Sequence, residues 1–158
     1  REKFWLESER VKTTRLWCYK VNVSDLEEVQ PGLYMTKATF TCHPTKYFKD
    51  TDTQRLTRSG TLTVQGSALA FPKITIVGQI AVETSFTIAG QVIRLERLTE
   101  SLVMVNNPDN PSFKTTTGKP VKWSGDFITV DPAKLKNVGV VLGPGIQSLE
   151  IETVWGWA

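Results

Sequence analysis

The sequence is poor in the residues that catalytic and metal sites use most: only one of its 158 residues is histidine and only two are cysteine. His43 stands directly before Pro44, and one histidine without partners cannot build a zinc site. Its neighbour Cys42 would point to the opposite face of a strand, so a Cys–His dyad is geometrically unfavourable. We therefore expect His43 to be a turn residue, and we predict no metal ligand and no catalytic residue.

The motifs of common enzyme classes are also missing. The chain has no G-x-S-x-G elbow and neither form of glycine-rich phosphate loop, G-x-x-x-x-G-K-[ST] or G-x-G-x-x-G. A glycosidase-type pair of carboxylates stays open, because a β-sandwich can bring two acids within about 5–9 Å. Glu150 and Glu152 alternate along the last expected strand, although such alternation is also common on a solvated edge. We predict that the protein is not an enzyme and needs no cofactor.

Long apolar runs and blocks of one charge are absent. No stretch approaches the roughly 18–20 apolar residues that span a bilayer, and no signal peptide opens the chain, which starts at Arg1 without methionine. We expect this start to be a processed or truncated end. The 19 basic and 16 acidic side chains leave a net charge of +3 and form no run of five like charges. We therefore predict neither nucleic acid nor a membrane as a partner. Cys18 and Cys42 lack C-x-x-C spacing and are expected to be reduced.

The sequence does contain period-2 alternation, the pattern of β-strands, along most of its length. One apolar line, expected to share a face, consists of Trp17, Tyr19, Val21 and Val23. A second line follows the turn signal Pro31-Gly32 and consists of Tyr34, Thr36, Ala38, Phe40 and Cys42. We predict that these two strands pair as a hairpin or lie as neighbours.

Short strands are also predicted at residues 60–64, 73–77, 83–88, 91–95, 102–105 and 138–142. Ala89-Gly90 is typical of a tight hairpin turn, and Asp131-Pro132 is typical of the start of a single helical turn. Residues 50–60 are predicted to be a loop or weak edge, and residues 106–120 the longest irregular segment. The last strand should place four residues on one face: Leu149, Ile151, Thr153 and Trp155. This pattern predicts an all-β fold, an antiparallel β-sandwich or barrel with short irregular loops.

Tryptophan is the residue type that best suggests a ligand, with five in the chain. An indole offers a flat apolar face and one N–H donor, which suits sugar rings and protein partners alike. The candidate contact residues are Trp123, Trp155 and Trp157. We expect Trp123 and Trp155 to fill a sandwich core unless they serve a ligand, and Trp157 to be exposed.

The order of several segments resembles the distal tail protein of long-tailed phages with non-contractile tails. Residues 15–45, RLWCYKVNVSDLEEVQPGLYMTKATFTCHPT, resemble the closing strands of that family's N-terminal ring domain, and Cys42-His43-Pro44 matches its Cys-x-Pro step. Residues 60–78 resemble the start of the family's second domain. Residues 124–127 and 142–149 resemble the last part of that second domain.

The resemblance implies that residues 1–44 are the end of an N-terminal ring or belt region and residues 45–158 a C-terminal galectin-like jelly roll. It implies a homo-hexameric hub in the virion, at the tail tip, assembled in the cytoplasm of the bacterial host. The second domain would hold receptor-binding or other baseplate proteins. Because most of the ring domain would be missing here, this chain alone is expected to be monomeric.

Two functions therefore remain open. The first is a structural tail-tip component that acts through its surfaces. The second is a carbohydrate-binding module for host cell-wall polysaccharide, which would use Trp157, Trp123 or the aromatics of residues 106–120.

Overall fold

The computed structural model describes residues 3–158, which form strands, turns and irregular segments with no helix among them. The chain divides into two compact units, Arg1–Lys49 and Asp50–Ala158. The boundary placed at residues 44/45 from the sequence falls inside a strand, and the assignment of the first part to a ring region stays a prediction. Within residues 3–158 there is no helix of the length and apolarity that crossing a bilayer requires.

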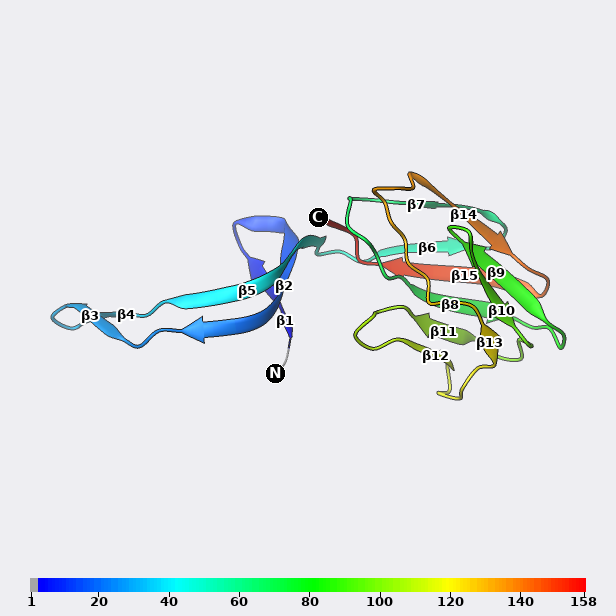
Figure 1. The fold of residues 1–158 in the computed structure, drawn as a ribbon, viewed down its shortest axis with the longest axis horizontal. Helices are drawn as coiled ribbons and strands as arrows, with labels where there is room; N and C mark the ends of the chain where they lie inside the picture. The colour runs from blue at the N-terminus through cyan, green and yellow to red at the C-terminus, as the bar shows by residue number, and fades with distance from the viewer. Residues whose placement is uncertain (1–2) are drawn as a thin grey trace. The chain divides into compact units, whose positions relative to one another are not determined.

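The first unit is a small antiparallel sheet that extends into a narrow arm (Figure 1). Its strands are β1 (Phe4–Ser8), β2 (Val11–Val23), β3 (Glu27–Gln30), β4 (Leu33–Met35) and β5 (Ala38–Phe48). β2 pairs with both β1 and β5, which confirms that the two predicted strands lie as neighbours. The second predicted strand is divided, however, because Tyr34 lies in β4 and Ala38 begins β5. The arm ends in the β3–β4 hairpin, where Gly32 has a φ of 77°. Pro31-Gly32 is thus the predicted turn, with glycine at the position that needs a positive φ.

The prediction that Trp17, Tyr19, Val21 and Val23 share one face is wrong. The register of β2 against β5 shifts on both sides of Cys18, and Tyr19 is the extra residue of one bulge. Trp17 lies opposite Trp5, whereas Val21 lies opposite Phe40. A bulge inserts one residue into the two-residue repeat, so the side chains beyond it change face.

The second unit is an antiparallel β-sandwich of two five-stranded sheets (Figure 1), which confirms the predicted fold class. One sheet has the order β13-β10-β9-β14-β7. Its strands are β13 (Trp123–Ser124), β10 (Gln91–Leu95), β9 (Thr84–Ile88), β14 (Asn137–Leu142) and β7 (Gly60–Thr63). The other has the order β12-β11-β8-β15-β6. Its strands are β12 (Ser112–Thr115), β11 (Leu102–Val105), β8 (Lys73–Gly78), β15 (Ile146–Thr153) and β6 (Asp52–Leu56). β16 (Gly156–Trp157) follows β15, and neither sheet closes into a barrel.

The core of the sandwich lies between the two sheets, and β15 contributes most regularly to it. Leu149, Ile151, Thr153 and Trp155 are each no more than 1% exposed, as the alternation predicts. The intervening Glu150 and Glu152 are partly exposed on the other face of the strand.

Two amide side chains replace ladder hydrogen bonds where strand pairing stops. The amide of Gln54 donates to the carbonyl of Thr63 and accepts from its N–H, at 2.8 and 2.9 Å. The amide of Gln91 likewise donates to the carbonyl of Thr129 and accepts from its N–H, at 2.6 and 3.1 Å. Each pair satisfies a backbone donor and acceptor that would otherwise need water. The first joins β6 to β7 of the other sheet, and the second fixes the segment before Asp131 to β10.

The predicted turns are present. Ala89 and Gly90 have φ values of 52° and 76°, the pattern of a type I′ hairpin turn. The Leu135 N–H donates to the carbonyl of Asp131 at 3.0 Å, and the Asp131 carboxylate accepts from Ala133 N–H at 3.1 Å. This is the predicted single helical turn with its capping aspartate.

Candidate functional site

The residues with nucleophilic potential lie in the first unit and do not form a reactive group. Cys18 and Cys42 face each other across β2 and β5 as free thiols. Burial raises the pKa of the Cys42 thiol above its ordinary value, and the hydrogen bond with Cys18 raises this pKa further. A thiol that stays protonated is a weak nucleophile. His43 lies within β5, so the prediction that it is a turn residue is wrong. Its exposed ring packs on Tyr19, with ring centroids 5.3 Å apart.

The glutamates of β15 are part of the outer face of their sheet. Glu152 forms an ion pair with Lys73 at 2.9 Å, and Glu150 lies between Arg55 and Thr75 on the neighbouring strands. Both glutamates thus belong to the polar outer surface of the sheet, beside basic or hydroxyl side chains of the neighbouring strands. Among residues 3–158, no three His, Cys, Asp or Glu side chains are close enough to hold a metal ion together.

Two of the three candidate tryptophans have opposite environments. Trp155 is 1% exposed, and its indole N–H donates to the carboxylate of Asp52 at 2.8 Å. Its ring faces are covered by the core, so Trp155 offers no surface to a ligand. Trp157 is 52% exposed, as expected from its place near the end of the sequence.

Trp123 is half-buried at the edge of the sandwich, between two phenylalanine rings. Its ring centroid lies 5.2 Å from that of Phe113 on β12 and 5.3 Å from that of Phe127, both in edge-to-face geometry. Because β12 and β13 are the edge strands of different sheets, the pair of Trp123 and Phe113 covers one open side of the core. The edge-to-face contacts leave the indole little freedom to change rotamer.

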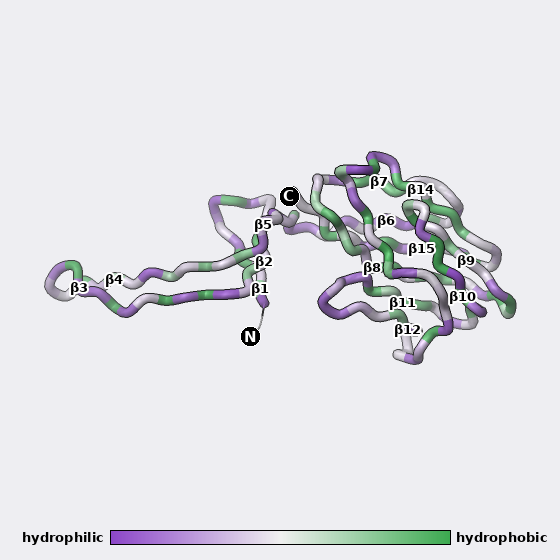
Figure 2. Tube along the Cα trace, viewed as in Figure 1, coloured by the Kyte–Doolittle hydropathy of each residue, from purple (hydrophilic) through white to green (hydrophobic). Residues whose placement is uncertain are grey.

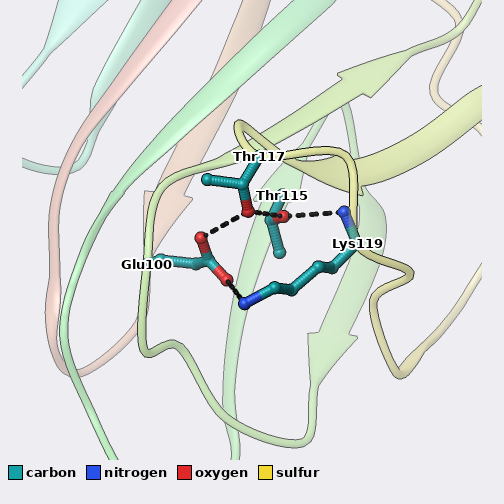
Figure 3. Close-up of polar contacts among 4 residues, drawn as sticks. All are labelled: Glu100, Thr115, Thr117 and Lys119. Atoms are coloured by element: carbon teal, nitrogen blue, oxygen red, sulfur yellow. Dashed lines mark hydrogen bonds and ion pairs between the residues drawn. The ribbon is translucent and has the colours of Figure 1, made fainter.

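The segment predicted to be the longest irregular one, residues 106–120, includes a strand and several hydrogen bonds within itself. It contains β12, which the sequence did not predict, and its single aromatic side chain, Phe113, is 7% exposed. Two residues of the turn after β12 contact Glu100, which precedes β11. Thr117 Oγ1 donates to the Glu100 carboxylate at 3.0 Å, and Lys119 Nζ forms an ion pair with it at 3.9 Å (Figure 3). Thr115 Oγ1 completes the group by accepting from Lys119 N–H at 3.0 Å. These contacts close the turn that follows β12.

A solvent-open hollow of about 220 Å³ lies beside Trp123, at the ends of β9, β10 and β13. Besides Trp123 and Leu95, its lining residues are polar: Glu83, Arg94, Glu96, Lys122 and Ser124. Sequence reasoning identified only Trp123 among them, because the others come from separate segments whose register alone brings them together. Arg94 lies opposite Ser124, and Leu95 lies opposite Trp123.

Aromatic residues also gather on one face of the sheet in the first unit. Trp5 packs on Trp17 with ring centroids 4.5 Å apart and ring planes tilted by 59°, and it meets Tyr47 edge-on at 5.3 Å. The guanidinium of Arg15 lies 4.0 Å from the Trp5 ring centroid, a cation–π contact. Even so, Trp5 is 37% exposed, so this cluster has an open side.

Hydrophobic residues recur among polar ones along the arm and are also present at its tip (Figure 2). The side chains of Leu33, Tyr34 and Met35 in β4 are 53–59% exposed, and Leu26 beside β3 is 72% exposed. Large apolar residues grouped on an exposed surface are typical of an interaction site. The first unit therefore offers a surface that a partner could cover.

The structure is similar to that of the SPP1 Dit protein, described as a paradigm of the hub adsorption apparatus in phages that infect Gram-positive bacteria. The match covers 96% of this chain, with a TM-score of 0.64 and 14% sequence identity. This chain spans 64% of the length of that protein. No protein-family model and no curated protein matches the sequence. At this identity the likeness shows a Dit-like fold, so the resemblance stated from the sequence is confirmed at the level of the fold.

Proposed function

We propose that this chain is part of a structural protein of the phage tail tip, a distal tail hub. Its sandwich would serve as the attachment platform for receptor-binding or other baseplate proteins. The observation that carries the proposal is the Dit-like fold over 96% of the chain. A shared fold does not fix a function, so the proposal also depends on what the surfaces of the two units can do.

The first unit supports an assembly role because very few of its side chains are buried. Among residues 3–49 only Cys18 is classed as buried, although the unit carries Phe4, Trp5, Phe40 and a tip of exposed apolar residues. A two-stranded arm is marginally stable alone in water, and a sheet normally covers its apolar face with another layer. We take the missing layer to come from the rest of the ring region and from neighbouring copies in a homo-hexamer.

The second unit supports a platform role because it is complete in itself. Its two sheets bury a continuous core that includes Ile74, Phe86, Ile93 and Leu149, each no more than 1% exposed. Such a domain can stay folded at the periphery of an assembly while its edges and loops hold other proteins. Within the proposal this sandwich is the galectin-like domain of a tail-tip protein, in a virion assembled in the host cytoplasm.

The proposal is tested by the oligomeric state of the full gene product, measured by mass photometry. We expect a hexamer. Replacing Leu33, Tyr34 and Met35 together by serine should abolish it, because the interface would lose the apolar side chains that stabilise it. A matched control replaces three exposed valines of the sandwich, Val82, Val92 and Val141, which are 42–64% exposed. A monomeric gene product, or a hexamer indifferent to the arm substitutions, would contradict the assembly role.

A further inference from the structure

The two cysteines of the chain occupy directly opposite positions on paired strands. Cys18 on β2 and Cys42 on β5 are Cα partners in the antiparallel register, and both are free thiols. Side chains at directly opposite positions lie on the same face of a sheet. The Cys18 Sγ also donates to the carbonyl oxygen of Thr41, the residue before Cys42, at 3.4 Å. The sulfur of Cys18 is therefore directed at β5, beside its counterpart.

We propose that Cys18 and Cys42 are the site of an intrachain disulfide, which forms when the protein leaves a reducing compartment and meets an organic disulfide such as glutathione disulfide. The bond would join β2 to β5 and close a ring from residue 18 to residue 42, which contains the arm. The site itself depends only on the geometry of the first unit. The occasion for oxidation rests on the proposed function, because a virion assembled in the reducing host cytoplasm is released into oxidising surroundings.

The spacing of the strands suits this bond. Opposite Cα atoms in a regular antiparallel pair lie about 4.5–5.5 Å apart, and disulfides bridge Cα separations of about 4.4–6.8 Å. The register shifts between Leu16 and Cys18 and again between Cys18 and Lys20. Because the ladder is irregular on both sides of the pair, a small approach of the two strands does not break a regular run of hydrogen bonds.

The exposure of the two thiols sets the order of the exchange steps. Cys42 is partly exposed, whereas Cys18 is 0% exposed, so an external disulfide meets Cys42 first. The Cys42 thiolate attacks one sulfur of glutathione disulfide, which forms a mixed disulfide and expels one glutathione thiolate. Cys18, after losing its proton, attacks the Cys42 sulfur and expels the second glutathione. The two cysteines together give up two protons and two electrons, and glutathione disulfide is reduced to two molecules of glutathione.

The first exchange step should be slow and the second fast. Burial and the hydrogen bond with Cys18 raise the pKa of the Cys42 thiol, so little thiolate is present at neutral pH and external reagents react slowly. Once the mixed disulfide has formed, Cys18 lies beside it in the same sheet, and proximity favours ring closure over attack by an external thiol. We therefore expect little accumulation of the mixed disulfide.

The experiment incubates the whole reduced chain with glutathione disulfide at about pH 8.5, near the pKa of an ordinary cysteine thiol. The chain is followed by intact mass and by tryptic digestion without reductant. We expect the intact mass to decrease by that of two hydrogen atoms, and we expect a linked pair of peptides, residues 16–20 and 38–46, each with one cysteine. Dithiothreitol should reverse both changes. Amide hydrogen exchange in residues 38–42 should slow about tenfold, because the ring restrains the opening of β2 from β5.

Two variants distinguish this site from general thiol reactivity. Cys18→Ser removes the thiol that displaces the second glutathione, so Cys42 should keep a stable glutathione adduct. Cys42→Ser is the matched control, since the remaining Cys18 is buried and should stay unmodified. The amide spectrum of each variant reports whether the fold is intact. The linked peptides are measured on the unchanged chain, so the central result does not depend on how either variant folds.

Three results would overturn the proposal. One is a folded chain that keeps both thiols free under conditions that fully oxidise the same chain in urea. Another is a lasting glutathione adduct on Cys42 of the unchanged chain without linked peptides. The third concerns virions alkylated with N-ethylmaleimide during purification: we expect linked peptides in them, and free thiols would exclude oxidation on release. Absence of the protein from virions would instead contradict the tail-tip role, on which the thiol results have no bearing.

Discussion

The indole N–H of Trp155 donates to the carboxylate of Asp52 at 2.8 Å, which joins the first and last parts of the sandwich across 103 residues of sequence. The same carboxylate oxygen accepts from the Gln54 amide at 2.6 Å. Gln54 in turn bonds to the backbone of Thr63 on β7, in the other sheet. One aspartate thus holds a core tryptophan and the amide that connects the two sheets.

Replacing Asp52 by alanine is expected to destabilise the sandwich by about 1–3 kcal/mol, because it leaves a buried indole N–H without an acceptor. Urea unfolding followed by tryptophan fluorescence measures this. Asp126→Ala is the control, since Asp126 is exposed and, among residues 3–158, makes no hydrogen bond or ion pair. Equal stability of the two variants would show that the contact between Asp52 and Trp155 contributes little.

Ala89 is the one residue other than glycine with a positive φ, at 52°, within the described chain. This conformation costs an L-residue with a Cβ roughly 1 kcal/mol, and asparagine tolerates it better at the first position of a type I′ turn. Ala89→Asn should therefore raise the free energy of unfolding by about 0.5–1 kcal/mol, whereas Ala89→Val should lower it. The midpoints of thermal unfolding compare the three proteins. The turn geometry would be contradicted if Ala89→Val had the highest unfolding midpoint of the three proteins.

The Cys42 thiol should react slowly with iodoacetamide at neutral pH, because burial and the hydrogen bond with Cys18 raise its pKa. The protonated form is favoured in the folded state, so its contribution to stability is present below the pKa of the unfolded thiol and is lost as the pH rises through the raised pKa of the folded state. Peptide-level mass spectrometry follows the rate between neutral and alkaline pH. Cys18→Ala should accelerate labelling of Cys42 near pH 8. If Cys18→Ala left the labelling rate of Cys42 unchanged, the hydrogen bond with Cys18 could not be a cause of the slow reaction.

Local signals in the sequence predicted the elements whose geometry is set by neighbouring residues. The alternation through Leu149, Ile151 and Thr153 predicted a buried face, and Ala89-Gly90 predicted its hairpin turn. Both features depend on residues no more than a few positions apart, so a single sequence contains them.

Features set by pairing between distant segments were not predicted. The bulge at Tyr19 follows from the register of β2 against β5, which the alternation within β2 does not encode. β12 is a strand because β11 supplies its hydrogen bonds. β6, for which the sequence left a loop or a weak edge open, is an edge strand paired with β15. The hollow could not be predicted for the same reason: Glu83, Arg94 and Trp123 come together only through sheet register. Trp123 was found because its residue type alone suggested a ligand.

The most direct test of the tail-tip role is the location of the protein in virus particles. Antibodies raised against residues 50–158, the sandwich unit, would be applied to purified virions encoding this chain and detected by immunogold electron microscopy. Our account predicts gold particles at the end of the tail opposite the head, with none along the tube. Virions without label, or label spread along the tube or over the capsid, would contradict it.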